Sequence, residues 1–482
     1  KDELWVGTDD GRLHLSINGG EEWKELTKGL KDMPEGAWIP FIHVSEHNEG
    51  EAWVVVNDYR RNNWKPYLYY TNNYGKSFKN IASADSIKSF CLSIIQDPVE
   101  ENLLFLGADD GLYYSLNKGE TWQKWAKDFP SVQVNDLKIQ KREKDLVVGT
   151  FGRAAWVLDD IEPLRQLANE EENLESKYLT VFSPPTGVIA NYKSAPRTRF
   201  AADAIYKGAN RGSRGRIRYW VNIPEGDSSL KKIKKVQFTI HNDQGEQIRS
   251  FKREYHKGLN QSYWNLDEKG TRVPSRDVRT KKQLEREPGG TEVLPGSYKV
   301  VVKLGEHKDS TIMDVIFDPR VEVSLIELQQ RAEFAKLVQV QSALMDSATI
   351  ELNKVEANIS VLKKLNTENT DSISKQTQKR LGSLQDSVNV LKVMVFGKKD
   401  VKGYFDQPDT WTYLFWQLRW GLGYHAPLQN KQLLLKELQE RTREQIVKIN
   451  KFIAEDWGEF EKYLEDNPVE LTKEIRTIQL DR

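Results

Sequence analysis

The sequence predicts a multidomain chain that is mainly β toward its N-terminal side and α toward its C-terminal side. Three observations carry this prediction. A short hairpin phrase recurs in residues 16–23, 71–78 and 115–122, segments with strand character follow at regular spacing up to Pro319, and helical periodicity begins at Val323. With 482 residues, the chain is too long for one hydrophobic core and should hold about three domains.

Each recurring phrase has the chemistry of a tight connection between two strands. It carries a hydroxyl, a side-chain amide, a glycine and an aromatic residue in that order. The hydroxyl and the amide can hydrogen-bond to the backbone of the turn, and glycine accepts the positive φ that other residues resist. A strand-like run precedes each phrase, and the spacing of the phrases suits β-propeller blades of about four strands each. The residues concerned are Ser16, Asn18, Gly20, Trp23, Thr71, Asn73, Gly75, Phe78, Ser115, Asn117, Gly119 and Trp122.

These phrases resemble Asp boxes, whose family pattern is Ser-x-Asp-x-Gly-x-Thr-Trp. Asp boxes, also called BNR repeats, occur in sialidases, xyloglucanase-type glycosidases, sortilin-type receptors and many exported bacterial proteins. The present chain has Asn18, Asn73 and Asn117 at the Asp position. In those families the box lies away from the active face, so the resemblance implies a structural role.

Residues 145–160 form a fourth unit, in which a strand is followed by Gly152 and Arg153 and by a second strand that ends in two aspartates. This run resembles the last propeller segment of large exported bacterial proteins of the sortilin-like or glycosyl-hydrolase-like type. The resemblance implies that residues 1–165 hold about four last blades of an incomplete propeller. We expect the natural protein to extend further toward its N-terminus, with missing blades or a partner chain covering the open sheet edge.

Residues 166–215 are predicted to be a linker that contains a Pro-Pro-Gly element and a basic loop. Basic residues between Lys193 and Arg218 are candidates for phosphate contacts. The chain as a whole has 71 basic and 71 acidic residues, so we favour a solvated loop or one that docks on an acidic surface, and expect no nucleic-acid partner.

Residues 216–320 show short strands at regular spacing and turns that resemble an immunoglobulin-like β-sandwich. Trp264 is predicted to fill the space between the two sheets, with a sugar-stacking platform as the alternative.

Residues 321–482 are predicted to be an α-helical bundle, because apolar residues recur every three or four positions in three segments. These segments run from 325 to about 362, from 374 to 396 and onward from 428. Between the last two lies the most aromatic stretch of the chain, with Trp411, Trp416 and Trp420. These tryptophans and Arg153 are the candidate binding residues, although a packed junction between helices is the favoured role of the tryptophans.

Composition narrows the function further. Cys91 is the only cysteine, so we expect no intrachain disulfide and no cysteine-based metal site, and we predict no metal and no cofactor. No stretch approaches the length of a membrane span. The resemblance implies export to the periplasm, the outer-membrane surface or the extracellular space, with attachment to a surface complex.

The function predicted from these observations is a non-catalytic interaction or scaffold module whose propeller face binds protein or glycan partners. The alternative is an exo-acting glycoside hydrolase, sialidase-like or xyloglucanase-like, whose catalytic acids lie partly in missing blades. Beyond Arg153 no arginine set of the sialidase type can be assembled, and no catalytic residue is assigned. The obvious acids sit in strand-end turns, where aspartate is favoured for backbone bonding alone. They are Asp9, Asp10, Asp109, Asp110, Asp159 and Asp160.

Overall fold

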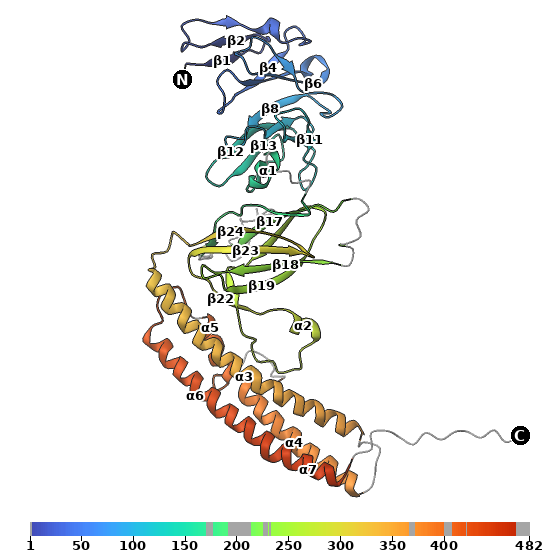
Figure 1. Cartoon of the computed structure of the whole chain (residues 1–482), viewed down its shortest axis with the longest axis vertical. Helices are drawn as coiled ribbons and strands as arrows, with labels where there is room; N and C mark the ends of the chain where they lie inside the picture. Colours follow the sequence, from blue (N-terminus) through green and yellow to red (C-terminus); the bar gives the residue numbers. More distant parts are fainter. Residues whose placement is uncertain are drawn as a thin grey trace, which may run out of the picture.

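The computed structural model describes residues 2–169, 177–190, 214–224, 230, 233–365, 372–399, 407–420 and 422–468. The molecule is elongated. Small sheets of the N-terminal third, a larger β unit and a set of long helices follow one another along its axis (Figure 1).

Four antiparallel sheets, called blades 1 to 4 below, precede Asp160 in the described part of the chain. Blade 1 contains β1 (Leu4–Gly7), β2 (Leu13–Ser16) and β3 (Lys24–Glu25). Blade 2 contains β4 (Trp38–Val44), β5 (Ala52–Asp58), β6 (Asn63–Thr71) and β7 (Lys79–Asn80). Blade 3 contains β8 (Cys91–Gln96), β9 (Leu104–Ala108), β10 (Gly111–Ser115) and β11 (Gln123–Lys124). Blade 4 contains β12 (Val134–Gln140), β13 (Asp145–Thr150) and β14 (Ala155–Leu158).

The blades are arranged as in a β-propeller. Each is a meander whose strands pair in sequence order, and the first strand of blade 3, β8, contacts the first strands of blades 2 and 4. Apolar cores lie between successive blades, so blades 2 and 3 bury both faces against their neighbours. Leu13 and Val54 share the first core, Trp53 and Ile94 the second, and Phe105 and Leu146 the third. The predicted blade organisation is therefore present.

Blade 1 differs from blades 2 and 3 at its inner edge. Its hairpin phrase joins its second and third strands, whereas the same phrase joins the third and fourth strands of the two complete blades. Strand β1 thus occupies the second position of a blade, equivalent to β5 and β9, which are buried along their whole lengths. In β1, Leu4 and Val6 are 39% and 43% exposed.

The blades end in a short helix, α1 (Glu162–Ala168), whose Leu164 and Ala168 pack into the core between blades 3 and 4. Arg165 of this helix reaches the carboxylate of Asp97 at the end of β8 with N–O distances of 2.9 to 3.1 Å. Both side chains are buried, so the pair fixes α1 to blade 3.

The second β unit has two sheets packed face to face. One has the order β15-β17-β20 and the other the order β16-β24-β23-β18-β19, with β21 and β22 as a separate pair. The strands are β15 (Leu179–Val181), β16 (Gly187–Ile189), β17 (Gly215–Val221), β18 (Lys235–His241), β19 (Gln247–Glu254), β20 (Gly258–Trp264), β21 (Asp267–Lys269), β22 (Gly289–Glu292), β23 (Gly296–Leu304) and β24 (His307–Phe317). A short helix, α2 (Lys281–Glu285), precedes β22.

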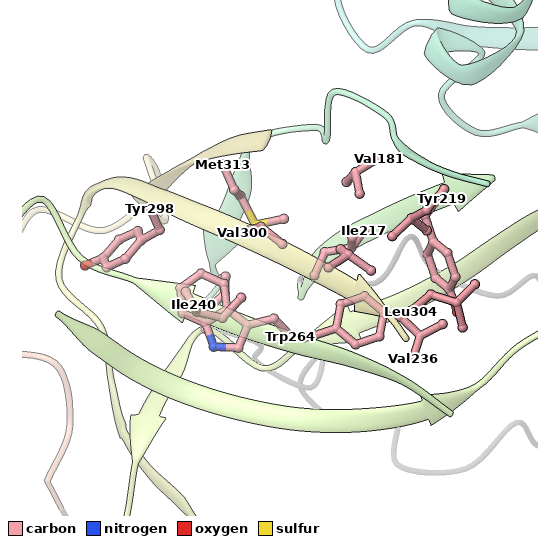
Figure 2. Packing of buried hydrophobic residues seen from close by; sticks show 14 of the residues in the cluster. Val181, Ile217, Tyr219, Val236, Ile240, Trp264, Tyr298, Val300, Leu304 and Met313 are labelled. Carbon is pink, nitrogen blue, oxygen red and sulfur yellow. The ribbon is translucent and has the colours of Figure 1, made fainter. Parts of the chain in front are cut away.

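The core of this unit contains side chains from both sheets (Figure 2). Trp264 is buried there, as the sequence predicts, with its ring 5.3 Å from that of Tyr298 and its Nε1 donating to the carbonyl of Asp267 at 2.9 Å. A fully buried indole has no free face for a sugar, so the stacking-platform alternative is excluded.

The structure corrects the extent of the predicted linker. Both β15 and β16 lie inside residues 166–215, yet β15 pairs with β17 and β16 pairs in parallel with β24. The second β unit therefore takes two strands from this segment. The basic residues from Lys193 to Arg211 lie outside the described residues.

Helices form the rest of the described chain. They are α3 (Leu325–Leu365), α4 (Ser372–Phe396), α5 (Trp411–Trp420), α6 (Gln429–Phe452), a π-helical turn η4 (Ile453–Trp457) and α7 (Gly458–Asp466). Helices α3, α4 and α6 contact one another, with a shared core that includes Leu352, Leu381 and Ile449. No helix in the described ranges is long and apolar enough to cross a membrane.

Candidate functional site

The recurring hairpin phrases occupy one end of the blades and use their polar side chains locally. The hydroxyl of Ser115 accepts from the backbone N–H of Gly119 at 2.8 Å and donates to Asn117 at 2.9 Å, while Asn117 accepts from the backbone N–H of Thr121 at 2.9 Å. The phrases that begin at Ser16 and Thr71 repeat these bonds. The asparagine thus acts through its carbonyl oxygen, the acceptor that an aspartate would also supply.

Two further features of the phrases fit a structural role. Gly20, Gly75 and Gly119 all have positive φ, at 101°, 67° and 89°. The aromatic residue packs on the preceding blade where one is described, since Trp122 donates from Nε1 to the carbonyl of Ile81 at 3.1 Å. Trp23 of blade 1 has no such neighbour among the described residues and is half-exposed.

The opposite end of the blades, called the loop face below, is formed by residues 8–12, 59–62, 109–110 and 151–154. Each of these loops joins the second and third strands of a blade or their equivalents. Backbone hydrogen bonds tie three of them to the starts of neighbouring inner strands. Ile39 donates to Thr8, Asp109 to Phe90 and Phe151 to Gln133.

An aromatic and arginine cluster lies on the loop face where blades 2 and 3 meet. The guanidinium of Arg60 lies 4.4 Å from the ring centroid of Trp38, and Tyr59 stacks on Phe90 at 4.7 Å. Trp64 contacts the same Phe90 at 5.5 Å and leaves 51% of its surface exposed. Arg60 makes no ion pair within the described part of the chain. We call these five residues the seam cluster.

A second exposed group of the loop face lies on blade 4. Phe151 is 71% exposed, Arg153 is exposed, and Trp156 donates from Nε1 to the carbonyl of Arg153 at 2.9 Å. The predicted binding residue Arg153 therefore lies on the same face as the seam cluster.

Two acids of the loop face near blades 1 and 2 are held by neighbouring groups. Asp10 accepts from the hydroxyl of Thr8 and pairs with Arg12 at 3.4 Å. The hydrogen bond from Thr8 is the main cause that lowers the pKa of Asp10. Asp58 pairs with Arg61 at 2.6 Å.

The aspartates of blade 3 are also engaged. Asp109 accepts from Ser89 at 3.1 Å and from Gln133 at 2.9 Å. Asp110 accepts from Tyr113 at 2.9 Å and pairs with Lys124 at 2.7 Å. Asp110 is therefore held by residues of its own blade, and Asp109 by residues that precede the first strands of blades 3 and 4.

Asp159 and Asp160 lie at the other end, where the chain leaves the blades for the second β unit. Arg216 lies 3.6 Å from Asp159 and Arg218 lies 3.0 Å from Asp160, and Arg218 also donates to both backbone carbonyls. These two arginines end the predicted basic stretch. The last two basic residues of this stretch therefore dock on acidic residues of the same chain.

The three predicted tryptophans of the helical region do not share one groove. Trp411 is fully buried and donates from Nε1 to the hydroxyl of Thr442 at 2.8 Å, so it belongs to the packed helical core and offers no binding surface. Trp416 is half-buried and stacks at 4.6 Å on Trp420, which is 76% exposed.

Sequence reasoning missed the seam cluster. Its residues come from β4, the β5–β6 loop, β6 and the start of blade 3, so no single segment displays it. A comparison of the blades could have pointed to it. Blades 1 and 3 have an Asp-Asp-Gly turn between their strands, whereas blade 2 has the sequence Tyr-Arg-Arg-Asn at the same place.

Within the described ranges, no group of three or more His, Cys, Asp or Glu side chains is arranged to hold a metal ion. Cys91 is fully buried in β8, and burial raises the pKa of its thiol to about 12. It is therefore an unreactive core residue.

No protein-family model and no curated protein sequence matches this chain. Among solved structures it is similar to YCF48 bound to D1 peptide, with 11% identity, a TM-score of 0.25, and coverage of 64% of this chain and 78% of that one. An ancestral GH74 enzyme has 13% identity and a TM-score of 0.24, over 65% of this chain and 39% of the enzyme. The GH74 xyloglucanase from Xanthomonas campestris has 10% identity and a TM-score of 0.20, over 64% of this chain and 60% of the enzyme.

The chain thus spans less than two thirds of either GH74 enzyme. TM-scores this low do not establish a shared fold or function. The description of the fold and of the candidate site therefore uses the geometry of this chain alone.

Proposed function

We propose that this chain is a non-catalytic interaction module whose loop face binds a protein or glycan partner at the cell envelope or surface. The observation that carries the proposal is the seam cluster. Trp64 offers an exposed indole, and Arg60 offers a guanidinium that stacks on Trp38 without an ion-pair partner among the described residues. Exposed aromatic and arginine side chains are the groups that dominate recognition surfaces.

The location of the loop face supports this role. The second β unit joins the blades at the end that carries the hairpin phrases, through Arg216 and Arg218. The loop face lies at the opposite end, where a large partner can approach it.

The engagement of Asp10, Asp109 and Asp110 argues against the hydrolase alternative. Glycoside hydrolysis needs two carboxyl groups across a cleft, one of them a general acid with a raised pKa. The pKa of Asp10 is lowered instead. Asp267, whose pKa is raised by burial, lies in the second β unit and pairs with Arg249 at 3.3 Å.

The exposed edge of blade 1 supports a further part of the proposal, in which additional propeller blades or a partner chain pair with β1. Equivalent strands in the complete blades are fully buried, and unpaired edge strands readily accept another strand. We also propose that the second β unit is immunoglobulin-like and that the hairpin phrases are Asp boxes. The protein is proposed to be exported to the periplasm, the outer-membrane surface or the extracellular space.

The proposal is tested by selecting ligands for the whole chain from a glycan array and a random peptide library. Each selected ligand is then titrated against the Arg60→Ala/Trp64→Ala variant and against Trp420→Ala, which removes a more exposed tryptophan far from the loop face. We expect the first variant to weaken binding at least tenfold and the second to leave it unchanged. Ligands that bind both variants equally well would refute the assignment of the loop face.

A separate assay addresses the alternative. Turnover of aryl glycosides that disappears in Asp10→Asn or Asp110→Asn would favour the hydrolase.

A further inference from the structure

A cavity of about 220 Å³ lies where β22 of the second β unit meets helices α3 and α5, far from the loop face (Figure 1). Ala335 and Val338 of α3 and Phe415 of α5 contribute its apolar lining. Phe415 is held in place because it stacks on Trp411 with ring centroids 5.0 Å apart. The wall is therefore built from side chains that the helical core already fixes.

Among the described residues, the charged side chains that line this cavity leave one positive charge without a counter-charge. Glu292, Arg331 and Arg419 all line it. Arg331 is engaged, since its Nη2 lies 3.0 Å from the carboxylate of Glu292 and its Nε donates to the carbonyl of Gly423 at 2.8 Å. Arg419 is exposed and makes no ion pair with any described residue. Its guanidinium lies 5.7 Å from the ring centroid of Trp416.

The size of the cavity suits one aromatic ring with a small polar group. An apolar cavity of about 150 Å³ is large enough to hold benzene. The remaining volume accommodates a carboxylate, and the unpaired guanidinium of Arg419 is the natural partner for it because arginine presents a planar fork of donors.

We propose that this cavity binds a small aryl carboxylate, with the ring packed between Val338 and Phe415 and the carboxylate paired with Arg419. A cationic ligand is disfavoured by the same charge. A neutral ligand would leave the guanidinium without a counter-charge. The site is independent of the loop face and adds a second, small-molecule ligand class to the chain.

Benzoate is the probe for this proposal, with benzamide as its neutral counterpart of nearly the same shape. Binding of both to the whole chain is measured by saturation-transfer NMR and by calorimetry. Three variants are compared with the wild type. Arg419→Gln removes the charge, Ala335→Phe fills the cavity, and Arg443→Gln removes an exposed arginine of α6 outside the cavity.

We expect benzoate to bind at least about tenfold more tightly than benzamide, because hydrogen bonds to charged groups are the stronger ones. Arg419→Gln should weaken benzoate binding by about tenfold or more and erase the preference over benzamide. Ala335→Phe should abolish binding of both probes, and Arg443→Gln should change neither. Circular dichroism checks that each variant is folded.

Two results would overturn the proposal: wild-type protein that binds no benzoate at millimolar concentration, or benzoate that binds Arg419→Gln as tightly as Arg443→Gln. If Ala335→Phe does not fold, the comparison of the two arginine variants still decides the question.

Discussion

Replacing Arg165 by methionine tests how the helix that follows the blades is fixed. The guanidinium of Arg165 makes three contacts of 2.9 to 3.1 Å with Asp97, and the two side chains are 6% and 0% exposed. Removing one partner of such a pair leaves the other charge buried, which typically costs about 3–5 kcal/mol.

The structure places the expected cost at the lower end of that range. Asp97 also accepts hydrogen bonds from the backbone N–H groups of Val99 at 2.9 Å and Glu100 at 2.8 Å, and these remain in the variant. Glu162, the second partner of Arg165, keeps its contact with Lys144 at 2.9 Å. We therefore expect Arg165→Met to destabilise the blades by about 3 kcal/mol.

The assay is thermal and urea unfolding of the whole chain, read together with amide hydrogen exchange in α1. For a unit of this size, about 3 kcal/mol corresponds to a melting point lower by about 6–12 °C. Hydrogen exchange assigns the loss to the blades, which matters because a chain with several cores does not unfold in one step.

A double-mutant cycle provides the control. Asp97→Asn keeps acceptors for the two backbone donors, so the double variant should be more stable than the sum of the two single losses predicts. Two results would show that the pair does not fix α1. One is that the two losses are additive, and the other is that Arg165→Met melts within about 2 °C of the wild type.

Three further predictions concern the blades. Arg60→Ala and Trp64→Ala should each change the free energy of unfolding by no more than about 1 kcal/mol in urea titrations, because both side chains are exposed; a larger loss would mean that the seam cluster supports the fold. Asn117→Ala should lower the free energy of unfolding by about 1–2 kcal/mol in the same titrations. Asn117→Asp keeps the acceptor oxygen, so its free energy of unfolding should stay within about 0.5 kcal/mol of the wild type. Equal losses in the two variants would contradict the role given to the side-chain carbonyl of Asn117. Burial lowers the pKa of His43, which packs against Trp53, to about 4. Because the unfolded chain then takes up the proton more readily, stability should fall as the pH drops from about 6.5 to about 4, by at most about 3 kcal/mol. His43→Phe should flatten that part of the stability profile, and a profile unchanged by the substitution would refute the assignment.

Local chemistry made the blades predictable. The hydroxyl, amide and glycine of each hairpin phrase interact within a few residues of one another, so the turn is visible in the sequence. The seam cluster could not be found in the same way, because Phe90 joins residues of blade 2 only after the two blades have packed together.

The pairing of β15 and β16 with the second β unit was missed for a different reason. Each has three residues, too few for an alternating pattern to appear, and β16 pairs with a strand that lies more than a hundred residues further along the chain. Long-range pairing of this kind leaves almost no local trace.

The apolar pattern of the first predicted helix is interrupted by polar residues after Val340, and this interruption has a structural cause. Helix α3 is continuous there, and its polar residues receive the segment that links β21 to α2. Ser342 donates to the carbonyl of Arg272, Asp346 pairs with Arg279, and Asn353 donates to the carbonyl of Ser275. These polar residues mark a docking surface rather than the end of a helix.

Because α3 is a single continuous helix, it acts as a rigid spacer. At about 1.5 Å per residue, its 41 residues span about 60 Å. Helices α4 and α6 lie against it and stiffen it, so the distance between its two ends varies little. The second β unit, which contacts α3 through β22, and the α7 region, which packs on the C-terminal half of α3, are thereby held apart by the polypeptide itself rather than by a flexible tether.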